Sequence, residues 1–116
     1  MHEMALMADI IQLVIEDAHT KGLNKINQIE LVVGEIASAM PDALTMAFSI
    51  YKEQSPELFE TEANLVIHHE AALAECILCG LRYKPSFKVA LCPSCRAPSG
   101  KIIAGEAFQV LSYEGG

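Results

Sequence analysis

Four cysteines in two close pairs are the residues of this chain best suited to chemistry. They follow the pattern C-x2-C-x12-C-x2-C, and the four positions are Cys76, Cys79, Cys92 and Cys95. Two residues between thiolates let one tight turn aim both sulfurs at one point, so two such turns complete a tetrahedron. A closed set of four thiolates leaves no position for water or substrate, which predicts a structural zinc site rather than a catalytic one.

Two other interpretations of the cysteines stay open. Iron also accepts four thiolates, and both turns resemble those of rubredoxin, which would give an electron-transfer site. Disulfides are the other alternative. They are disfavoured in a reducing cytosol, where we place the chain because its amino terminus has neither the basic start nor the apolar run of a secretory signal.

The amino-terminal sequence Met1-His2-Glu3 is a second candidate metal site. The α-amine of Met1, the amide nitrogen of His2 and the His2 ring nitrogen can close two fused chelate rings in one plane. Three in-plane nitrogens favour Ni(II) or Cu(II). Glu3 either binds the metal, steers a partner, or is only the acid that suits the start of a helix. We expect metal affinity to fall as the pH drops through the range in which the imidazole and the amine take up protons.

The charge distribution bears on the partners of the chain. A net charge of −7 disfavours general binding to nucleic acid, which calls for a basic surface. Five of the eight basic residues nevertheless lie between Cys76 and Lys101, with no acid among them: Arg82, Lys84, Lys88, Arg96 and Lys101. A module that binds nucleic acid or an acidic protein is therefore the alternative function. The spacings contain no nucleophile and base pair and no phosphate-binding loop, so we predict no enzyme.

Helices and strands must position these residues. Apolar residues at helical spacing predict one helix from Glu3 to about Lys21, ended by Gly22, and a second from Pro41 to about Ser55. Apolar and β-branched residues predict strands over 25–36, 63–70 and 106–113. The predicted fold is α+β, a small mixed three-stranded sheet with two helices. Residues 1–70 and 106–116 would form this domain, interrupted by a zinc-ribbon module with rubredoxin-type knuckles over 71–105.

Several of these motifs together resemble a known family. They are Met1-His2-Glu3 before an amphipathic helix, Val33-Gly34-Glu35, Pro41 through Leu44 with Phe48, the sequences CILCG and CPSC, and Gly105-Glu106. This combination is similar to the HypA/HybF nickel-insertion proteins of [NiFe]-hydrogenase maturation, and the similarity covers essentially the whole chain. Many zinc ribbons share the four-cysteine motif alone, whereas its combination with Met-His-Glu at the terminus is specific.

The resemblance implies a nickel metallochaperone with two metals. Transferable Ni(II) would be bound through Met1 and His2, with Glu3 beside them, and structural Zn(II) by the four cysteines. Family members pass nickel to the hydrogenase large subunit together with a GTPase partner of the HypB type, and some also serve urease maturation. We therefore expect a cytoplasmic monomer or weak dimer that binds neither nucleic acid nor a membrane.

Overall fold

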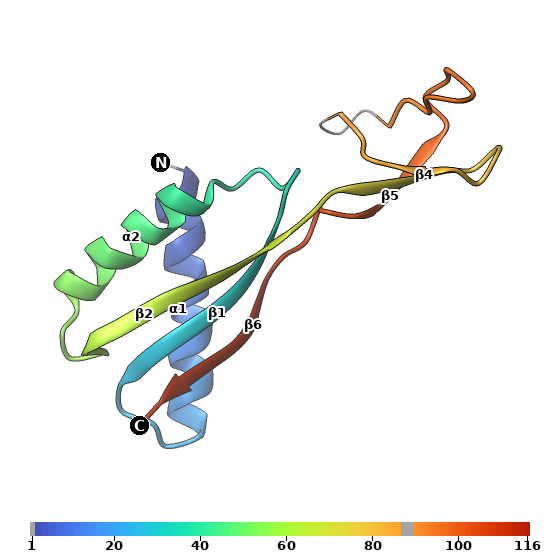
Figure 1. The fold of residues 1–116 in the computed structure, drawn as a ribbon. Helices are drawn as coiled ribbons and strands as arrows, with labels where there is room; N and C mark the ends of the chain where they lie inside the picture. Colours follow the sequence, from blue (N-terminus) through green and yellow to red (C-terminus); the bar gives the residue numbers. More distant parts are fainter. Residues whose placement is uncertain (1, 87–89) are drawn as a thin grey trace. The chain divides into compact units, whose positions relative to one another are not determined.

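The computed structural model describes residues 2–86 and 90–116. Its elements, in chain order, are α1 (His2–Thr20), β1 (Ile26–Gly34), α2 (Pro41–Gln54), β2 (Phe59–Glu70), β3 (Leu73–Cys76), β4 (Arg82–Tyr83), β5 (Gly100–Ala104) and β6 (Phe108–Gly115). The strands form two three-stranded sheets, in the orders β2-β1-β6 and β4-β3-β5 (Figure 1). The predicted α+β class, with two helices and a three-stranded sheet, is confirmed. In the part of the chain that the structure describes, no helix is long and apolar enough to span a membrane.

The chain divides into two compact units, and the first comprises Met1–Leu31, Ala39–His68 and Gln109–Gly116. The β2-β1-β6 sheet is mixed. The amide of Ile26 donates to the carbonyl of Leu58, so β1 and β2 begin side by side and run parallel, with α2 as their crossover. The amide of Gly116 donates to the carbonyl of Lys25, which joins the end of β6 to the start of β1 in antiparallel direction.

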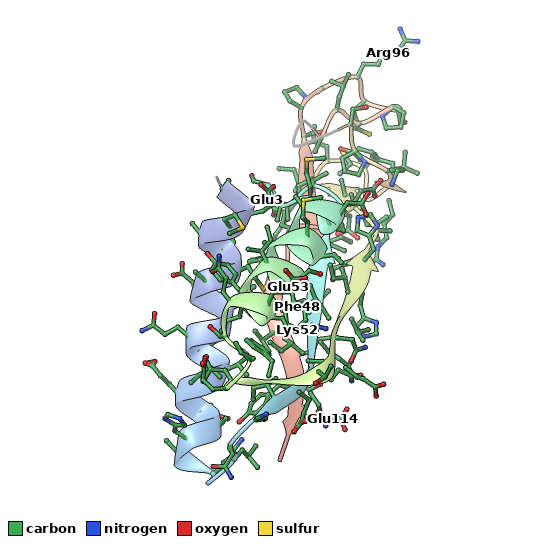
Figure 2. All side chains as sticks on the ribbon, turned by 90° about the vertical axis from the view of Figure 1, so that its left-hand side faces the viewer. Glu3, Phe48, Lys52, Glu53, Arg96 and Glu114 are labelled. Carbon is green, nitrogen blue, oxygen red and sulfur yellow. The ribbon has the colours of Figure 1, made fainter. Side chains whose placement is uncertain are left out.

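Both helices lie on one face of this sheet (Figures 1 and 2). The core between them contains the fully buried side chains of Met7, Ile29, Leu31 and Leu44. Gly22 ends α1 with φ of 74°, where the amide of Leu23 bonds back to the helix, and Pro41 opens α2. Both helix boundaries agree with the periodicity to within a residue or two.

The strand boundaries differ more from the prediction. β2 begins at Phe59, not residue 63, because the Phe59 ring packs edge-on against Phe48 at 5.5 Å and fixes the chain there. The exposed residues Glu60 and Glu62 that follow carry no apolar signal. β1 ends at Gly34 rather than residue 36, and β6 covers Phe108–Gly115 rather than residues 106–113.

The second unit comprises Val32–Ser38 and His69–Phe108. β3 pairs antiparallel with both β4 and β5, with Ala74 opposite Tyr83 on one side and Ile102 on the other. The stretches 71–75 and 97–105, for which the sequence analysis predicted no strand, therefore contain paired strands. Their pairing joins residues far apart in the chain, so periodicity within each short segment does not reveal it.

Two glutamates hold the backbone of this second unit together. Glu35 accepts a hydrogen bond from the Ala72 amide at 2.8 Å and forms an ion pair with Lys84, and Glu70 accepts one from the Gly105 amide at 2.7 Å. The Ala72 amide, and after it Lys84, hold the pKa of Glu35 below its usual value. Each carboxylate therefore accepts a hydrogen bond from a backbone amide that lies just outside a strand and has no strand carbonyl as its partner.

Candidate metal sites

The two cysteine pairs form turns with the same internal geometry. The Gly80 amide donates to the carbonyl of Cys76 at 2.9 Å, and the Arg96 amide donates to that of Cys92 at 2.7 Å. Both residues stand four positions after the first cysteine of their pair and adopt left-handed backbone angles, with φ of 76° at Gly80 and 57° at Arg96. Figure 2 shows the Arg96 side chain extending away from the turn.

This equivalence predicts opposite effects for two substitutions. Gly80→Ala is expected to cost about 1–2 kcal/mol through backbone strain alone, because nothing lies within 4 Å of the added Cβ. Arg96→Gly is expected to relieve strain of the same kind and to slow zinc loss. Release of zinc to a chromogenic chelator measures both. Loss rates that fall for Gly80→Ala, or rise for Arg96→Gly, would contradict the common geometry of the turns.

The four sulfurs lie at distances suited to one metal ion. All four are within 4.8 Å of one another, with Cys76 and Cys95 sulfurs 3.8 Å apart and Cys79 and Cys92 sulfurs 3.7 Å apart. A tetrahedron of Zn–S bonds has sulfur–sulfur edges of about 3.8 Å. A disulfide needs about 2.05 Å. The structure thus brings the predicted cysteines together as a set that suits structural zinc, with the two pairs facing each other.

Hydrogen bonds to the Cys76 sulfur favour its thiolate form. The Ser99 hydroxyl lies 3.0 Å from the Cys76 sulfur and lowers the pKa of Cys76 to about 6. The Cys95 amide lies 3.3 Å from the Cys92 sulfur. In contrast, contacts with Cys79 and then Cys76 raise the pKa of Cys95 to about 12. Four thiolates this close repel one another, and a divalent cation compensates their charge. Ser99 gave no signal in the sequence, because its role depends on the turn that returns it to the first pair.

The amino-terminal candidates lie in the first unit, and Met1 is outside the described residues. His2 is exposed on the first turn of α1. Glu3 is buried, and its carboxylate accepts a hydrogen bond from the Met40 amide at 3.2 Å. Met40 is the residue that precedes α2, where no cap by its own side chain is present. Glu3 therefore satisfies a free amide at the start of α2 and joins the beginnings of the two helices.

A second bond ties the first turn of α1 to the C-terminal part of α2. The Tyr51 hydroxyl donates to the Met4 carbonyl at 3.0 Å. The Met40 bond is also the main reason why the pKa of Glu3 lies below its usual value. The sequence left open whether Glu3 serves the metal or the helix, and the structure gives its carboxylate a structural partner. Met40 and Tyr51 could not be identified from the sequence, since both contacts cross more than thirty-five positions.

Known proteins are similar to this chain in sequence and in fold. The family model described as "Hydrogenase/urease nickel incorporation, metallochaperone, hypA" matches residues 1–115. The hydrogenase maturation factor HypA of Moorella thermoacetica is 35% identical over 115 residues, which are 99% of each chain. That of Chlorobium limicola is 34% identical over 112 residues, 97% of this chain and 94% of the other.

Two solved structures have the same fold. A solution structure of a HypA protein superposes with a TM-score of 0.68 at 27% identity, covering 99% of this chain and 96% of the other. That of the Ni metallochaperone HypA from Helicobacter pylori has a TM-score of 0.64 at 24% identity, covering 97% and 96%. The sequence match over nearly the whole length, together with the clustered cysteines, shows that this chain belongs to the HypA family of nickel metallochaperones in hydrogenase maturation.

Proposed function

We propose that this chain binds transferable Ni(II) through the Met1 amine and the amide and ring nitrogens of His2. It would deliver the ion to the hydrogenase large subunit in the cytoplasm, together with a GTPase partner of the HypB type. The observation that carries this proposal is the exposed His2 at the start of α1, on a helix end fixed to α2 through Glu3 and Tyr51. An exposed imidazole on a rigid support can take up an ion and pass it on.

The three nitrogens also provide a route for release. Each must give up or lack a proton to bind the metal, so protonation competes directly with nickel. Glu3 lies next to His2 but directs one carboxylate oxygen to the Met40 amide. We assign it the role of orienting the first turn of α1. A partner that displaces one nitrogen, or donates a proton to it, would lower the affinity enough for transfer.

We further propose that the four cysteines hold Zn(II) as a scaffold for partner contacts. Two of the five basic residues of this segment form ion pairs inside the second unit, Arg82 with Glu75 at 3.0 Å and Lys84 with Glu35. Lys88 lies outside the described residues. Internal pairing reduces the positive charge that a nucleic-acid surface would need, and thus favours a protein partner. Urease maturation proteins are the other clients that we propose.

The decisive experiment adds one glycine before Met1 and measures nickel binding by calorimetry. This change moves the amine away from the chelate, so nickel affinity is expected to fall at least about 100-fold, since even changes around a metal's ligands cost 10–100-fold. One glycine added after Gly116 is the matched control and should bind nickel normally. Both proteins should keep one zinc per chain and an unchanged circular dichroism spectrum.

Two results bear on the ligand assignment. Equal nickel affinity of the two glycine variants would rule out the amine as a ligand. Glu3→Gln keeps an oxygen that can accept the Met40 hydrogen bond but removes the charge. If Glu3 only orients the helix, this variant should bind nickel nearly as well as the parent. If the Glu3 carboxylate is a nickel ligand, the variant should bind nickel more weakly.

A further inference from the structure

Ser99 supplies the one side-chain hydroxyl that contacts a cysteine sulfur in residues 2–86 and 90–116. Its Oγ lies 3.0 Å from the Cys76 sulfur and 3.4 Å from the carbonyl oxygen of Ala97. A thiolate bound to a metal has no proton to donate, so in a zinc-loaded site the hydroxyl donates to the sulfur. The Ala97 carbonyl already accepts the Cys92 amide at 3.0 Å. The Ser99 hydroxyl is therefore directed at a metal ligand.

The backbone around Ser99 holds its hydroxyl in this position. The Ser99 carbonyl accepts the amide of Ile77, inside the first cysteine turn, at 2.9 Å, and Gly100 pairs with Cys76 where β3 meets β5. The Gly100 amide donates to the Ala90 carbonyl at 3.0 Å. A Cβ on Gly100 would lie 2.6 Å from that oxygen, so this close approach needs glycine. Backbone contacts thus fix Ser99 independently of its hydroxyl.

Several side chains that bond across the fold serve its backbone instead. Lys52 of α2 donates hydrogen bonds to the carbonyls of Thr61 and Ala63 in β2, an edge strand of its sheet, at 3.2 and 2.9 Å. Glu3 likewise accepts the Met40 amide. The partners are polar groups of the fold itself, so these contacts need no metal.

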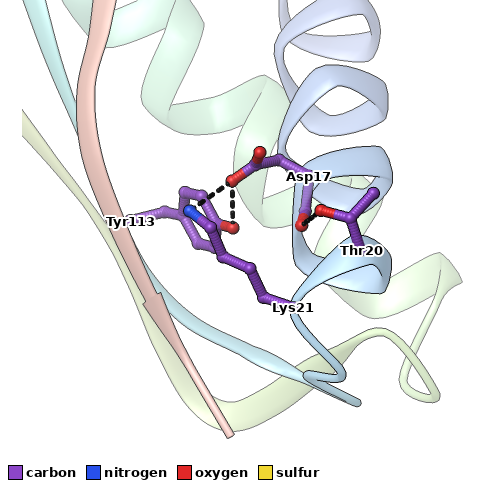
Figure 3. A network of polar contacts seen from close by, with 4 residues as sticks. All are labelled: Asp17, Thr20, Lys21 and Tyr113. Carbon is purple, nitrogen blue, oxygen red and sulfur yellow. Dashed lines mark hydrogen bonds and ion pairs between the residues drawn. The ribbon is translucent and has the colours of Figure 1, made fainter.

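The polar network between α1 and β6 is also complete by itself (Figure 3). The Asp17 carboxylate forms an ion pair with Lys21 at 2.8 Å and accepts a hydrogen bond from the Tyr113 hydroxyl. The Thr20 hydroxyl donates to the Asp17 carbonyl at 2.7 Å. The charges there balance within the first unit, whereas clustered thiolates need a metal ion to balance their charge. The Ser99 contact therefore belongs to the metal site.

The four sulfurs differ in the support that they receive. Cys76 and Cys92 are buried. Besides Ser99, the Cys76 sulfur accepts the amides of Leu78 at 3.4 Å and Cys79 at 3.5 Å. The Cys92 sulfur accepts one amide, at 3.3 Å, from the last cysteine of its pair. Cys76 is therefore the most firmly held of the two buried ligands.

The two exposed sulfurs are less supported, and Cys95 is the weaker of them. The Leu81 amide is the backbone partner of the Cys79 sulfur. In the part of the chain that the structure describes, no amide or hydroxyl donates to the Cys95 sulfur. Gly80 follows Cys79 and adopts its left-handed φ without strain, but Arg96 follows Cys95 and adopts this region with a side chain. Exposure, turn strain and missing donors thus coincide at one ligand.

We propose that Ser99 is a positioning residue of the zinc site that anchors the metal at Cys76, and that the site opens at Cys95. The hydroxyl draws charge from the Cys76 thiolate, and the fixed backbone keeps this sulfur in place while another ligand exchanges. A competing ligand then approaches from the exposed Cys95 side. This inference rests on the proposed four-thiolate zinc site and adds the order in which its ligands leave.

Cobalt(II) in place of zinc reports on the Ser99 contact. Loss of the donor returns electron density to the Cys76 thiolate, so Ser99→Ala should move the sulfur-to-cobalt charge-transfer band to longer wavelength. Zinc affinity, measured by competition with a chelator, should fall about 10-fold, because loss of a partner around a metal's ligands costs roughly 10–100-fold. Ser99→Thr keeps a hydroxyl and should restore both values. Ser94→Ala removes an exposed hydroxyl from the second turn and is the matched control.

Limiting iodoacetamide identifies the ligand that leaves first. A thiolate forms a bond to the reagent's carbon and iodide leaves, and peptide mass spectrometry locates the product. In the zinc-loaded parent, Cys95 should be modified first. First modification of Cys76, Cys79 or Cys92 would overturn the proposal, and so would an unshifted cobalt band in Ser99→Ala. A parent whose cobalt spectrum lacks four-thiolate coordination would instead disprove the zinc site itself, so the two failures are distinguishable.

Discussion

Replacing Cys92 with serine is expected to unfold the cysteine module and abolish zinc binding, while α1, α2 and their sheet stay folded. The Cys92 sulfur is fully buried and faces that of Cys79 across the site, and a serine hydroxyl is a poor substitute for a thiolate. Structural zinc contributes on the order of 10–16 kcal/mol in small modules. Since the second unit has few large buried side chains, this loss exceeds what its packing can offset.

Metal analysis and an NMR spectrum of the full chain measure both parts of this result. One zinc per chain should be lost, and amide signals of β3 and β5 should collapse while those of α1 and α2 remain dispersed. Ser94→Ala is the matched control, because Ser94 is exposed in the same turn and carries no metal-binding atom in our assignment. A serine variant that keeps both zinc and dispersed signals would refute the four-thiolate site, and red protein containing iron would refute zinc.

Gly105→Ala should be a strongly destabilising small substitution outside the cysteines, because it combines backbone strain with a steric contact. Gly105 has φ of 103°, and an added Cβ would lie 2.5 Å from the Ala72 Cα. Left-handed strain of about 1–2 kcal/mol and overpacking of about 1–3 kcal/mol act together, so we expect a loss of about 3 kcal/mol in unfolding free energy. The backbone itself is the obstacle, so no side-chain rotation can relieve it.

Gly22→Ala separates the two contributions. Gly22 has a similar left-handed φ of 74°, but nothing lies within 4 Å of its added Cβ, so only strain remains. Urea unfolding followed by circular dichroism gives the total, and zinc release reports on the second unit, which contains Gly105. Equal losses of unfolding free energy for Gly105→Ala and Gly22→Ala would show that the structure relieves the contact with Ala72 at little cost.

Local signals allowed much of the fold and of the site to be predicted. The helices follow from apolar spacing with Gly22 and Pro41 as boundaries, and the cysteine spacing alone anticipated the clustered sulfurs. Contacts between distant segments could not be predicted. The strands β3 and β5 form only through their pairing with each other, and the start of β2 depends on Phe48. For the same reason, the Ser99 contact with Cys76 and the Glu3 contact with Met40 were invisible in the sequence.

The Lys52 side chain has a consequence for the size of any assembly this chain forms. A sheet with one accessible edge can pair once and then has none left, so growth stops at two copies. A sheet with two accessible edges has no such limit and can polymerise into a fibre. By bonding to the Thr61 and Ala63 carbonyls, the Lys52 ammonium group blocks backbone acceptors that an added strand would need at the β2 edge. Acetylation or loss of Lys52 would therefore free two backbone acceptors of β2 and leave the exposed Glu60 and Glu62 as the charges that oppose pairing at this edge.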